Sequence, residues 1–184
     1  MIVFLTEEES MKVTLEIFIS RFWPTKIPGV DWIALSFQGK SDLEKNIAPK
    51  MKNWNYGTPH FVILRDQDGS DCKQLKTKLC ELADQGGRTF TVRVVCNELE
   101  SWFLGELESV EAVYPASKAS KHQNAAKFRA PDDLGNASEE LEKLVNITGK
   151  VSRAEVIASR FDPVKCVSRS FQVFWKTTTT LMNG

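Results

Sequence analysis

Hydrophobic and polar positions follow a repeating order along the first part of the chain. Short apolar runs rich in β-branched residues alternate with longer segments whose apolar residues recur at roughly helical spacing. The apolar runs cover residues 2–6, 31–37, 60–66 and 89–96. Four strands that alternate with helices predict a mainly parallel sheet with helical cover.

The segments after these runs are the predicted helices. They cover residues 11–23, 41–54, 71–87 and 97–115. Ser41 or Asp42 is expected to cap the second of them, because short polar side chains satisfy the free N–H groups of a first helical turn. The paired glycines at 86–87 are expected to end the third.

Beyond about residue 115 the pattern changes. The stretch "ASKASKHQNAAKFRAPDDLGN" is polar and predicts a long loop, and three helices are expected after it in 137–149, 152–161 and 168–181. Ser152 is expected to cap the second of these, and Phe171, Phe174 and Trp175 to pack the third. We therefore expect an α/β core over 1–114, with a basic loop and C-terminal helices at 115–184 packing on it as a single domain.

Composition narrows the classes of function. Lys and Arg number 24, as do Asp and Glu, so contact with nucleic acid must come from a local patch. No run is long enough to cross a bilayer, and the first apolar run lacks the form of a signal peptide, so no membrane role is expected. The four cysteines show no CxxC spacing, which argues against a zinc site and suits a cytoplasmic address.

Acidic residues gather where three of the four predicted strands end. They are Glu7, Glu8 and Glu9 after the first strand, Asp66, Asp68 and Asp71 after the third, and Glu98 and Glu100 after the fourth. Ligands of open parallel sheets bind at the carboxyl ends of the strands. Carboxylates brought together there repel one another unless a cation or a proton lies between them. Mg²⁺ or Mn²⁺ is the expected cation, because both prefer oxygen ligands.

Part of this acidity has a structural explanation, since acids favour the first turn of a helix. That explanation suits Glu9, Asp71 and one of Glu98 and Glu100. Asp66 and Asp68 are different, because they follow a strand with one residue between them. In an extended chain their side chains point the same way, which predicts a paired metal site.

Three known motifs share letters with this segment. An EF-hand loop is excluded, because the sixth and twelfth positions counted from Asp66 are Asp71 and Thr77. "DQDGS" matches the DxDG(T/S) motif of haloacid-dehalogenase phosphatases, but two β-α units precede it and a helix follows at once. "FQGKSD" has Ala34 where a P-loop needs glycine. A phosphatase remains the alternative that these motifs leave open.

Several stretches together resemble a known family. A glutamate after the first strand and a later D-x-D resemble Toprim domains, the metal-dependent fold of topoisomerases, primases and nucleases of the overcoming-lysogenization-defect (OLD) type. The stretches "FLTEEESM", "FQGKSDL", "VILRDQDGSDCKQLK", "CNELESWFLG" and "SRSF" resemble, in their order and spacing, small Toprim-like bacterial proteins encoded beside ATPases in defence loci. The resemblance covers nearly the whole chain.

The resemblance implies roles for the acids. Glu7 takes the place of the Toprim glutamate, a general acid/base or metal ligand, and Asp66 and Asp68 that of the metal-binding D-x-D. Glu98 and Glu100 are further candidate metal ligands, of which one is expected to face the site.

The chain also departs from the Toprim pattern at two positions. Glu8 stands where Toprim domains usually have glycine, and Met11 where many of the nucleases have a further acid. These departures leave the number of bound metal ions open.

Basic residues are candidates for contact with substrate. Lys40 ends the second strand just before a helix N-terminus, where phosphate binds readily. Lys118, Lys121, Lys127 and Arg129 form a basic stretch that would serve as a nucleic-acid contact or as a solvated loop.

Together these features predict a Mg²⁺- or Mn²⁺-dependent nuclease or phosphodiesterase acting on DNA or RNA. The resemblance implies an ATPase partner and a context of bacterial defence. An alternative of a different class is a weak or inactive Toprim-like subunit that regulates an ATPase complex. The missing acid at Met11 and the neutral net charge favour this alternative. In either case Glu7 is expected to meet Asp66 and Asp68 at one sheet edge.

Overall fold

The computed structural model describes residues 1–184, and the chain divides into two compact units, Met1–Val94 and Val95–Gly184. The expected boundary after residue 114 falls inside the second unit. The expectation that residues 115–184 complete a single domain with the core stays a prediction.

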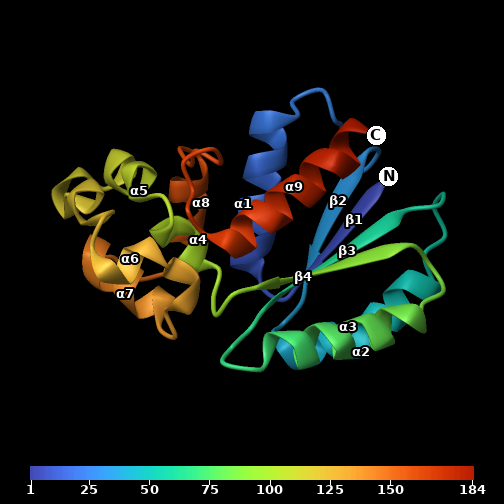
Figure 1. Ribbon diagram of the computed structural model, residues 1–184. Coiled ribbons are helices and arrows are strands. Elements are labelled where there is room, and N and C mark those ends of the chain that lie inside the picture. The colour runs from blue at the N-terminus through green and yellow to red at the C-terminus, as the bar shows by residue number, and fades with distance from the viewer. The chain divides into compact units, whose positions relative to one another are not determined.

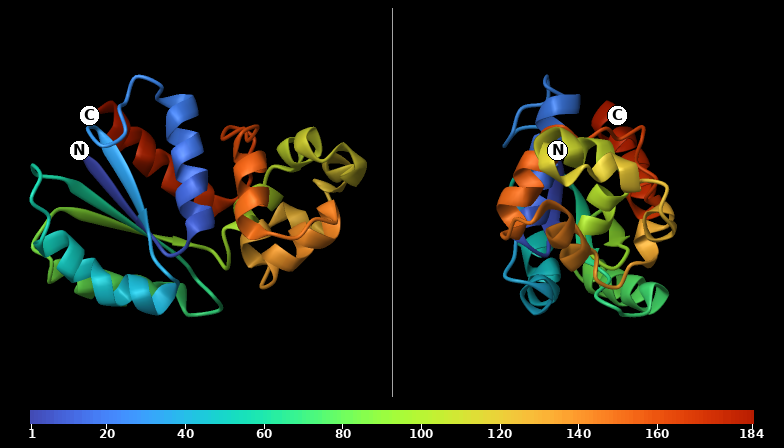
Figure 2. Two further views of the ribbon diagram at one scale, coloured as in Figure 1. Left: turned by 180° about the vertical axis from the view of Figure 1, so that it is seen from behind. Right: turned by 90° about the vertical axis from the view of Figure 1, so that its left-hand side faces the viewer.

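The first unit contains the sheet (Figure 1). Its elements are β1 (Ile2–Thr6), α1 (Glu9–Phe22), β2 (Trp32–Ser36), α2 (Lys40–Lys52), β3 (His60–Asp66), α3 (Cys72–Asp84) and β4 (Phe90–Val95). The strand order is β2-β1-β3-β4, and β1 runs parallel to both of its neighbours. Helix α1 covers one face of the sheet, while α2 and α3 lie side by side on the other (Figure 1, Figure 2). This arrangement confirms the predicted α/β fold.

The core of the first unit lies between the sheet and the α2–α3 pair. Every residue of β1 is buried, as expected for a central strand covered on both faces. Helix α2 contributes Leu43, Ile47 and Met51, and α3 contributes Leu75, Leu79 and Ala83. These residues are spaced by four, so each helix turns a single apolar stripe toward the sheet.

The second unit is helical. Its α-helices are α4 (Glu100–Leu104), α5 (Leu107–Val113), α6 (Ala126–Arg129), α7 (Ala137–Val145), α8 (Lys150–Ala158) and α9 (Arg169–Asn183). The predicted loop after residue 115 contains α6 and three short 3₁₀ helices, η1 (Pro115–Ser117), η2 (Ala119–His122) and η3 (Pro131–Asp133).

The single helix expected over 97–115 is wrong, because Gly105 separates α4 from α5. A Cβ atom at this glycine would lie 2.9 Å from Cys166 Sγ and 3.0 Å from Ser168 N. Glycine is therefore needed for the close approach of the later segment.

Aromatic side chains fill the interior around α9. Trp102 lies 5.3 Å from Phe171 and 4.8 Å from Phe174 between ring centroids, and all three are buried. The predicted packing role of Phe171 and Phe174 is confirmed. The N-cap of α9 is Ser168, whose hydroxyl accepts a hydrogen bond from Phe171 N at 3.1 Å.

Two predicted helix caps are wrong. The cap of α2 is Gly39 rather than Ser41 or Asp42, and the Asp42 carboxylate instead accepts from Gln38 N at 2.9 Å. The cap of α8 is Gly149 rather than Ser152, whose hydroxyl donates back to Gly149 O at 3.1 Å. Both glycines adopt a positive φ, a conformation that side chains disfavour.

No helix combines the length and the apolar character that crossing a membrane requires. The four cysteines are free thiols, of which Cys166 is buried and the other three are partly buried.

Candidate active site

Glu7 lies where β1 ends and leans toward the end of β3. Its backbone N–H donates to Leu64 O at 3.2 Å, which continues the parallel pairing of β1 with β3 by one residue. Its side chain is buried, and Oε2 accepts a hydrogen bond from Asp66 N at 3.2 Å. The glutamate is therefore held against the first of the two predicted metal-binding aspartates.

Asp66 and Asp68 differ in backbone and in burial. Asp66 is the last residue of β3 and is 4% exposed, whereas Asp68 lies on an exposed turn with φ of +50°. Asp is among the residues that tolerate this left-handed region. The expectation that both side chains point one way from an extended chain is therefore wrong. After Asp66 the chain turns through Asp68 and Gly69, which both have a positive φ. It then enters α3 at its N-cap, Asp71.

The charge of Asp68 acts on the carboxylate of Glu7. Burial raises the pKa of Glu7, and the negative charge of Asp68 raises this pKa further. Arg65 and the Asp66 N–H oppose that rise. The structure thus places Glu7, Asp66 and Asp68 together at one sheet edge.

Asp71 and Glu9 have structural roles, as predicted. The Asp71 side chain caps α3 by accepting from Gln74 N at 2.8 Å. Glu9 lies in the first turn of α1, where its carboxylate accepts from Ser36 Oγ and pairs with Lys12 at 2.9 Å.

A buried arginine, which the sequence analysis missed, adjoins the glutamate. Arg65 is 4% exposed, with Nε 3.6 Å from Glu7 Oε2 and one terminal nitrogen donating to Glu44 at 2.8 Å. Glu44 on α2 is also paired with Lys78 on α3 at 2.7 Å. The available signal was an arginine inside the apolar run "HFVILRD", because a buried arginine needs an acidic partner.

Lys40, predicted to bind phosphate, is the first residue of α2. Its Nζ lies 3.6 Å from Asp68 Oδ2, and over half of the side chain is exposed. The lysine therefore balances part of the carboxylate charge at this edge. An exposed pair of this kind contributes little stability, so the side chain is able to turn toward another anion.

The donor atoms suit a hard divalent cation. In this conformation no group of three or more His, Cys, Asp or Glu side chains is arranged to hold a metal ion. Mg²⁺ commonly binds through one or two carboxylates and keeps several waters, so a closed cage is not required. Two neighbouring carboxylates, one of which raises the pKa of the other, are the partners that such a cation would stabilise.

Glu98 and Glu100 belong to the second unit, where both contact Ser138 at the start of α7. Glu98 Oε2 accepts from Ser138 N at 2.8 Å, and Glu100 Oε1 accepts from Ser138 Oγ at 3.2 Å. Glu100 also lies 3.8 Å from the buried Arg153. These contacts give both glutamates a structural role. Their metal-binding role stays a prediction.

The basic stretch of the second unit is mostly exposed. Lys118 and Lys121 lie at the surface around η2, and Lys118 has φ of +50°. Lys127 is paired with Glu140 at 2.5 Å, which leaves less of its charge for a phosphate. Substrate contact by Lys118 and Lys121 stays a prediction.

Comparisons with known proteins support the fold. The C-terminal region of the Burkholderia pseudomallei OLD protein matches with a TM-score of 0.58 at 20% identity, over 98% of this chain and 97% of that one. The C-terminal region of the Xanthomonas campestris pv. campestris OLD protein matches with a TM-score of 0.50 at 17% identity, over 98% and 94%. At this identity the likeness shows the fold alone, and it confirms the Toprim-type fold expected from the sequence.

Sequence comparison assigns the family. No curated protein gives a significant match. A family model described as "Domain of unknown function" matches residues 6–178, which is most of the chain. The chain belongs to this family, DUF4276.

Proposed function

We propose that the protein is a Mg²⁺- or Mn²⁺-dependent phosphodiesterase that cleaves DNA or RNA at the edge formed by Glu7, Asp66 and Asp68. The observation that carries the proposal is the state of the Glu7 carboxylate. This carboxylate is buried and accepts a hydrogen bond from Asp66 N, and the negative charge of Asp68 raises its pKa. The likeness of the fold to the C-terminal region of OLD proteins supports it.

In this proposal Asp66 and Asp68 would hold the cation, with Glu7 beside them. A divalent cation supplies a polarised phosphoryl oxygen and a water of lowered pKa. Glu7 would accept the proton of the attacking water, a task that suits a carboxylate whose pKa lies above that of an ordinary glutamate. Arg65 lies beside Glu7 and opposes that rise in its pKa.

Lys40 provides the contact with substrate. Its ammonium group lies beside Asp68 and is exposed, so it can exchange its ion pair for a phosphate oxygen. The preceding Gly39 caps α2 without any side-chain hydrogen bond, which leaves the first N–H groups of the helix open to an anion.

The experiment is a cleavage assay on plasmid, single-stranded DNA and RNA with Mn²⁺ or Mg²⁺. Asp66→Asn and Glu7→Gln are each expected to lower the rate on the order of a hundredfold or more, about 2.7 kcal/mol in the barrier. Asp71→Asn is the matched control, because an asparagine also caps a helix and this acid has only that role. Cleavage by Asp66→Asn at the wild-type rate would overturn the site.

A second function is supported by the same geometry. The carboxylates do not form a closed ligand set, and Lys40 already lies against Asp68. These observations favour a Toprim-like subunit that binds or regulates without cleaving. The sequence resemblance to proteins encoded beside ATPases supports an ATPase as partner and a role in bacterial defence. Calorimetry with Mn²⁺ separates the two functions, since a dissociation constant no better than millimolar favours the regulatory one.

The phosphatase alternative has less support. Helix α3 begins at Cys72, four residues after Asp68, so no flap follows the D-x-D segment. This alternative would be supported if the protein hydrolysed a small phosphomonoester and if Asp66→Asn lost that activity.

A further inference from the structure

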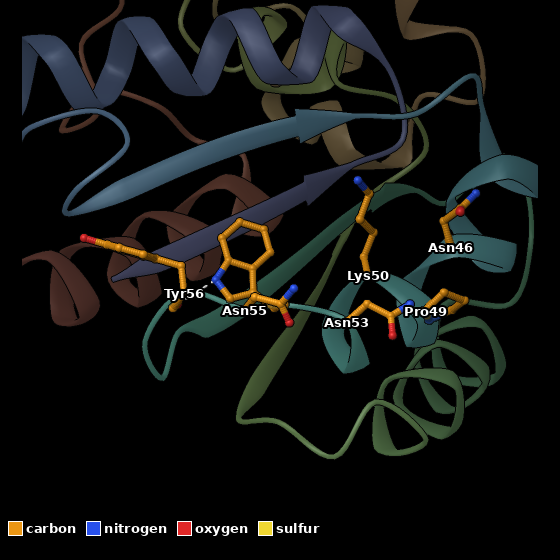
Figure 3. A pocket seen from close by; sticks show the side chains of 7 residues that line it. Asn46, Pro49, Lys50, Asn53, Asn55 and Tyr56 are labelled. Carbon is orange, nitrogen blue, oxygen red and sulfur yellow. Dashed lines mark hydrogen bonds between the residues drawn. The ribbon is translucent and has the colours of Figure 1, made fainter.

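A cavity of about 570 Å³ lies at the end of α2 and in the loop that leads to β3. Its lining includes Asn46, Lys50, Asn53, Trp54, Asn55 and Tyr56. Figure 3 shows Asn46 and Lys50 on the helix and Asn55 and Tyr56 on the loop, with Asn46 and Tyr56 at opposite ends of the group. Lys40 opens the same helix and the cavity adjoins its last turns, so this site is separate from the carboxylate edge.

The loop that forms the cavity is fixed by three contacts of one residue. Trp54 Nε1 donates to Tyr56 O at 2.8 Å, which closes the loop on itself. The indole ring lies 5.7 Å from the ring of the buried Phe61 at an angle of 90°. Arg88 donates to Trp54 O at 3.0 Å. The cavity wall is therefore built into the unit rather than formed by a loose chain.

The lining offers an aromatic ring, amides and one positive charge. Tyr56 is 61% exposed, which is unusual for a large ring on a fixed loop. Asn46 uses its amide N–H groups on Asp42, at 2.8 Å and 2.9 Å, which leaves its carbonyl oxygen as an acceptor. Lys50 is exposed and forms no ion pair, and no acidic residue lines the cavity.

We propose that this cavity binds single-stranded nucleic acid. A base stacks on Tyr56, the asparagine amides contact the base edge, and the Lys50 ammonium contacts a phosphate. Aromatic faces combined with basic side chains are the usual means of holding single strands with little sequence preference. A neutral sugar would also stack on an aromatic ring, but it would gain no charge attraction from the Lys50 ammonium, whereas a phosphate group would.

The cavity would guide the strand toward the carboxylate edge. Helix α2 has 13 residues, which at 1.5 Å each separates its two ends by about 20 Å. A strand lying along this helix would reach from Tyr56 to Lys40. This guiding role rests on the proposed function, whereas binding in the cavity does not.

The test measures binding without metal. Fluorescence anisotropy of labelled 12-nucleotide oligo-dT and oligo-U, in EDTA and at several salt concentrations, gives the affinity and its salt dependence. Tyr56→Ala is expected to weaken binding about five- to a hundredfold through the lost stacking, while Tyr56→Phe keeps the wild-type affinity. Lys50→Ala is expected to reduce the slope of log affinity against log salt by about 0.7.

Matched controls separate local from general effects. Lys45→Ala removes another exposed charge of α2 that lies outside the cavity and is expected to leave the slope near the wild-type value. Wild-type affinity in Tyr56→Ala, absence of binding by the wild type, or Tyr56-dependent binding of a neutral oligosaccharide in place of the oligonucleotides would overturn the proposal.

The same assay distinguishes this proposal from the proposed function. Binding without cleavage by the wild type removes the phosphodiesterase and leaves the cavity assignment standing. Cleavage by a wild type whose binding does not depend on Tyr56 removes the cavity assignment alone.

Discussion

Each unit of the protein contains a buried arginine, and the two are used differently. Arg153 in the second unit donates to Glu142 at 2.9 Å and to Ile147 O at 2.7 Å, and it also contacts Ser138 and Glu100. Its contacts join α7, α8 and the start of α4. Arg153 therefore stabilises the packing of these three helices.

Arg65 in the first unit has fewer close partners. It makes one short hydrogen bond, to Glu44, while its nearest approach to Glu7 is 3.6 Å. Glu7 therefore keeps a raised pKa although a cation lies beside it. The difference indicates that the contacts of Arg153 serve stability in the second unit, whereas Arg65 in the first unit leaves Glu7 with a raised pKa.

The largest expected effect tests the structural arginine. Arg153→Met should lower the free energy of unfolding by about 3–5 kcal/mol, because it leaves the buried Glu100 carboxylate without its arginine. Urea denaturation measures this loss. Lys143→Met removes an exposed cation of the same unit and should change stability by less than about 0.5 kcal/mol. A loss below about 1 kcal/mol in Arg153→Met would show that the two arginines do not differ in this way.

The next effect concerns a buried acid of the second unit. Burial raises the pKa of Glu106 to about 7 from the ordinary 4.5. A folded protein that holds a proton more tightly than the unfolded chain loses stability as pH rises from about 4.5 through 7. The loss should be roughly 1–3 kcal/mol and should be absent in Glu106→Gln.

Urea denaturation between pH 4.5 and pH 8 measures the slope, which does not depend on the absolute stability of the variant. Glu108→Gln removes an exposed neighbouring acid whose charge raises the pKa of Glu106 less than burial does, so the slope should fall only slightly. An unchanged slope in Glu106→Gln would assign the pH dependence to other acids.

A smaller effect tests the site arginine. Arg65→Met removes the charge that lowers the pKa of Glu7, so the acid limb of the pH–activity profile should move to higher pH. Stability should fall by about 1–2 kcal/mol, less than for Arg153→Met, because Glu44 keeps Lys78. Lys78→Met removes the exposed end of this network and should leave the profile unchanged. A profile that does not move in Arg65→Met would remove Arg65 from the site.

The smallest effect has the opposite sign. Asp68→Asn removes the negative charge that raises the pKa of Glu7, so this pKa should fall. Carbon-13 NMR of the Glu7 carboxyl in metal-free protein measures it without relying on activity. A Glu7 pKa that rises or stays constant would show that Asp68 lies outside the field of this carboxylate.

The strands were predictable because their sequence signals are local. The runs at 2–6 and 60–66 match β1 and β3 at both ends, since apolar β-branched stretches are bounded by polar residues. The location of the acids at the strand ends follows from the same pattern. Asp71 was also recognisable, because an aspartate before a helical stretch is a standard cap.

Features that depend on contacts distant in sequence were not predictable in the same way. The pairing of Arg65 with Glu44 joins a strand to a helix 21 positions earlier, and it depends on how α2 lies on the sheet. The need for glycine at position 105 depends on the approach of Cys166. The turn at Asp68 was missed because the extended spacing of the pair was assumed to continue past the end of β3.

The left-handed backbone at Asp68 also limits how the site could be lost in evolution. Glycine, asparagine and aspartate adopt this conformation more readily than most other residues, so most replacements would strain the turn as well as remove the carboxylate. Asparagine and glycine are each one nucleotide change away from an aspartate codon. A lineage that lost the Asp68 carboxylate while keeping the fold would therefore be expected to carry one of these two residues at position 68.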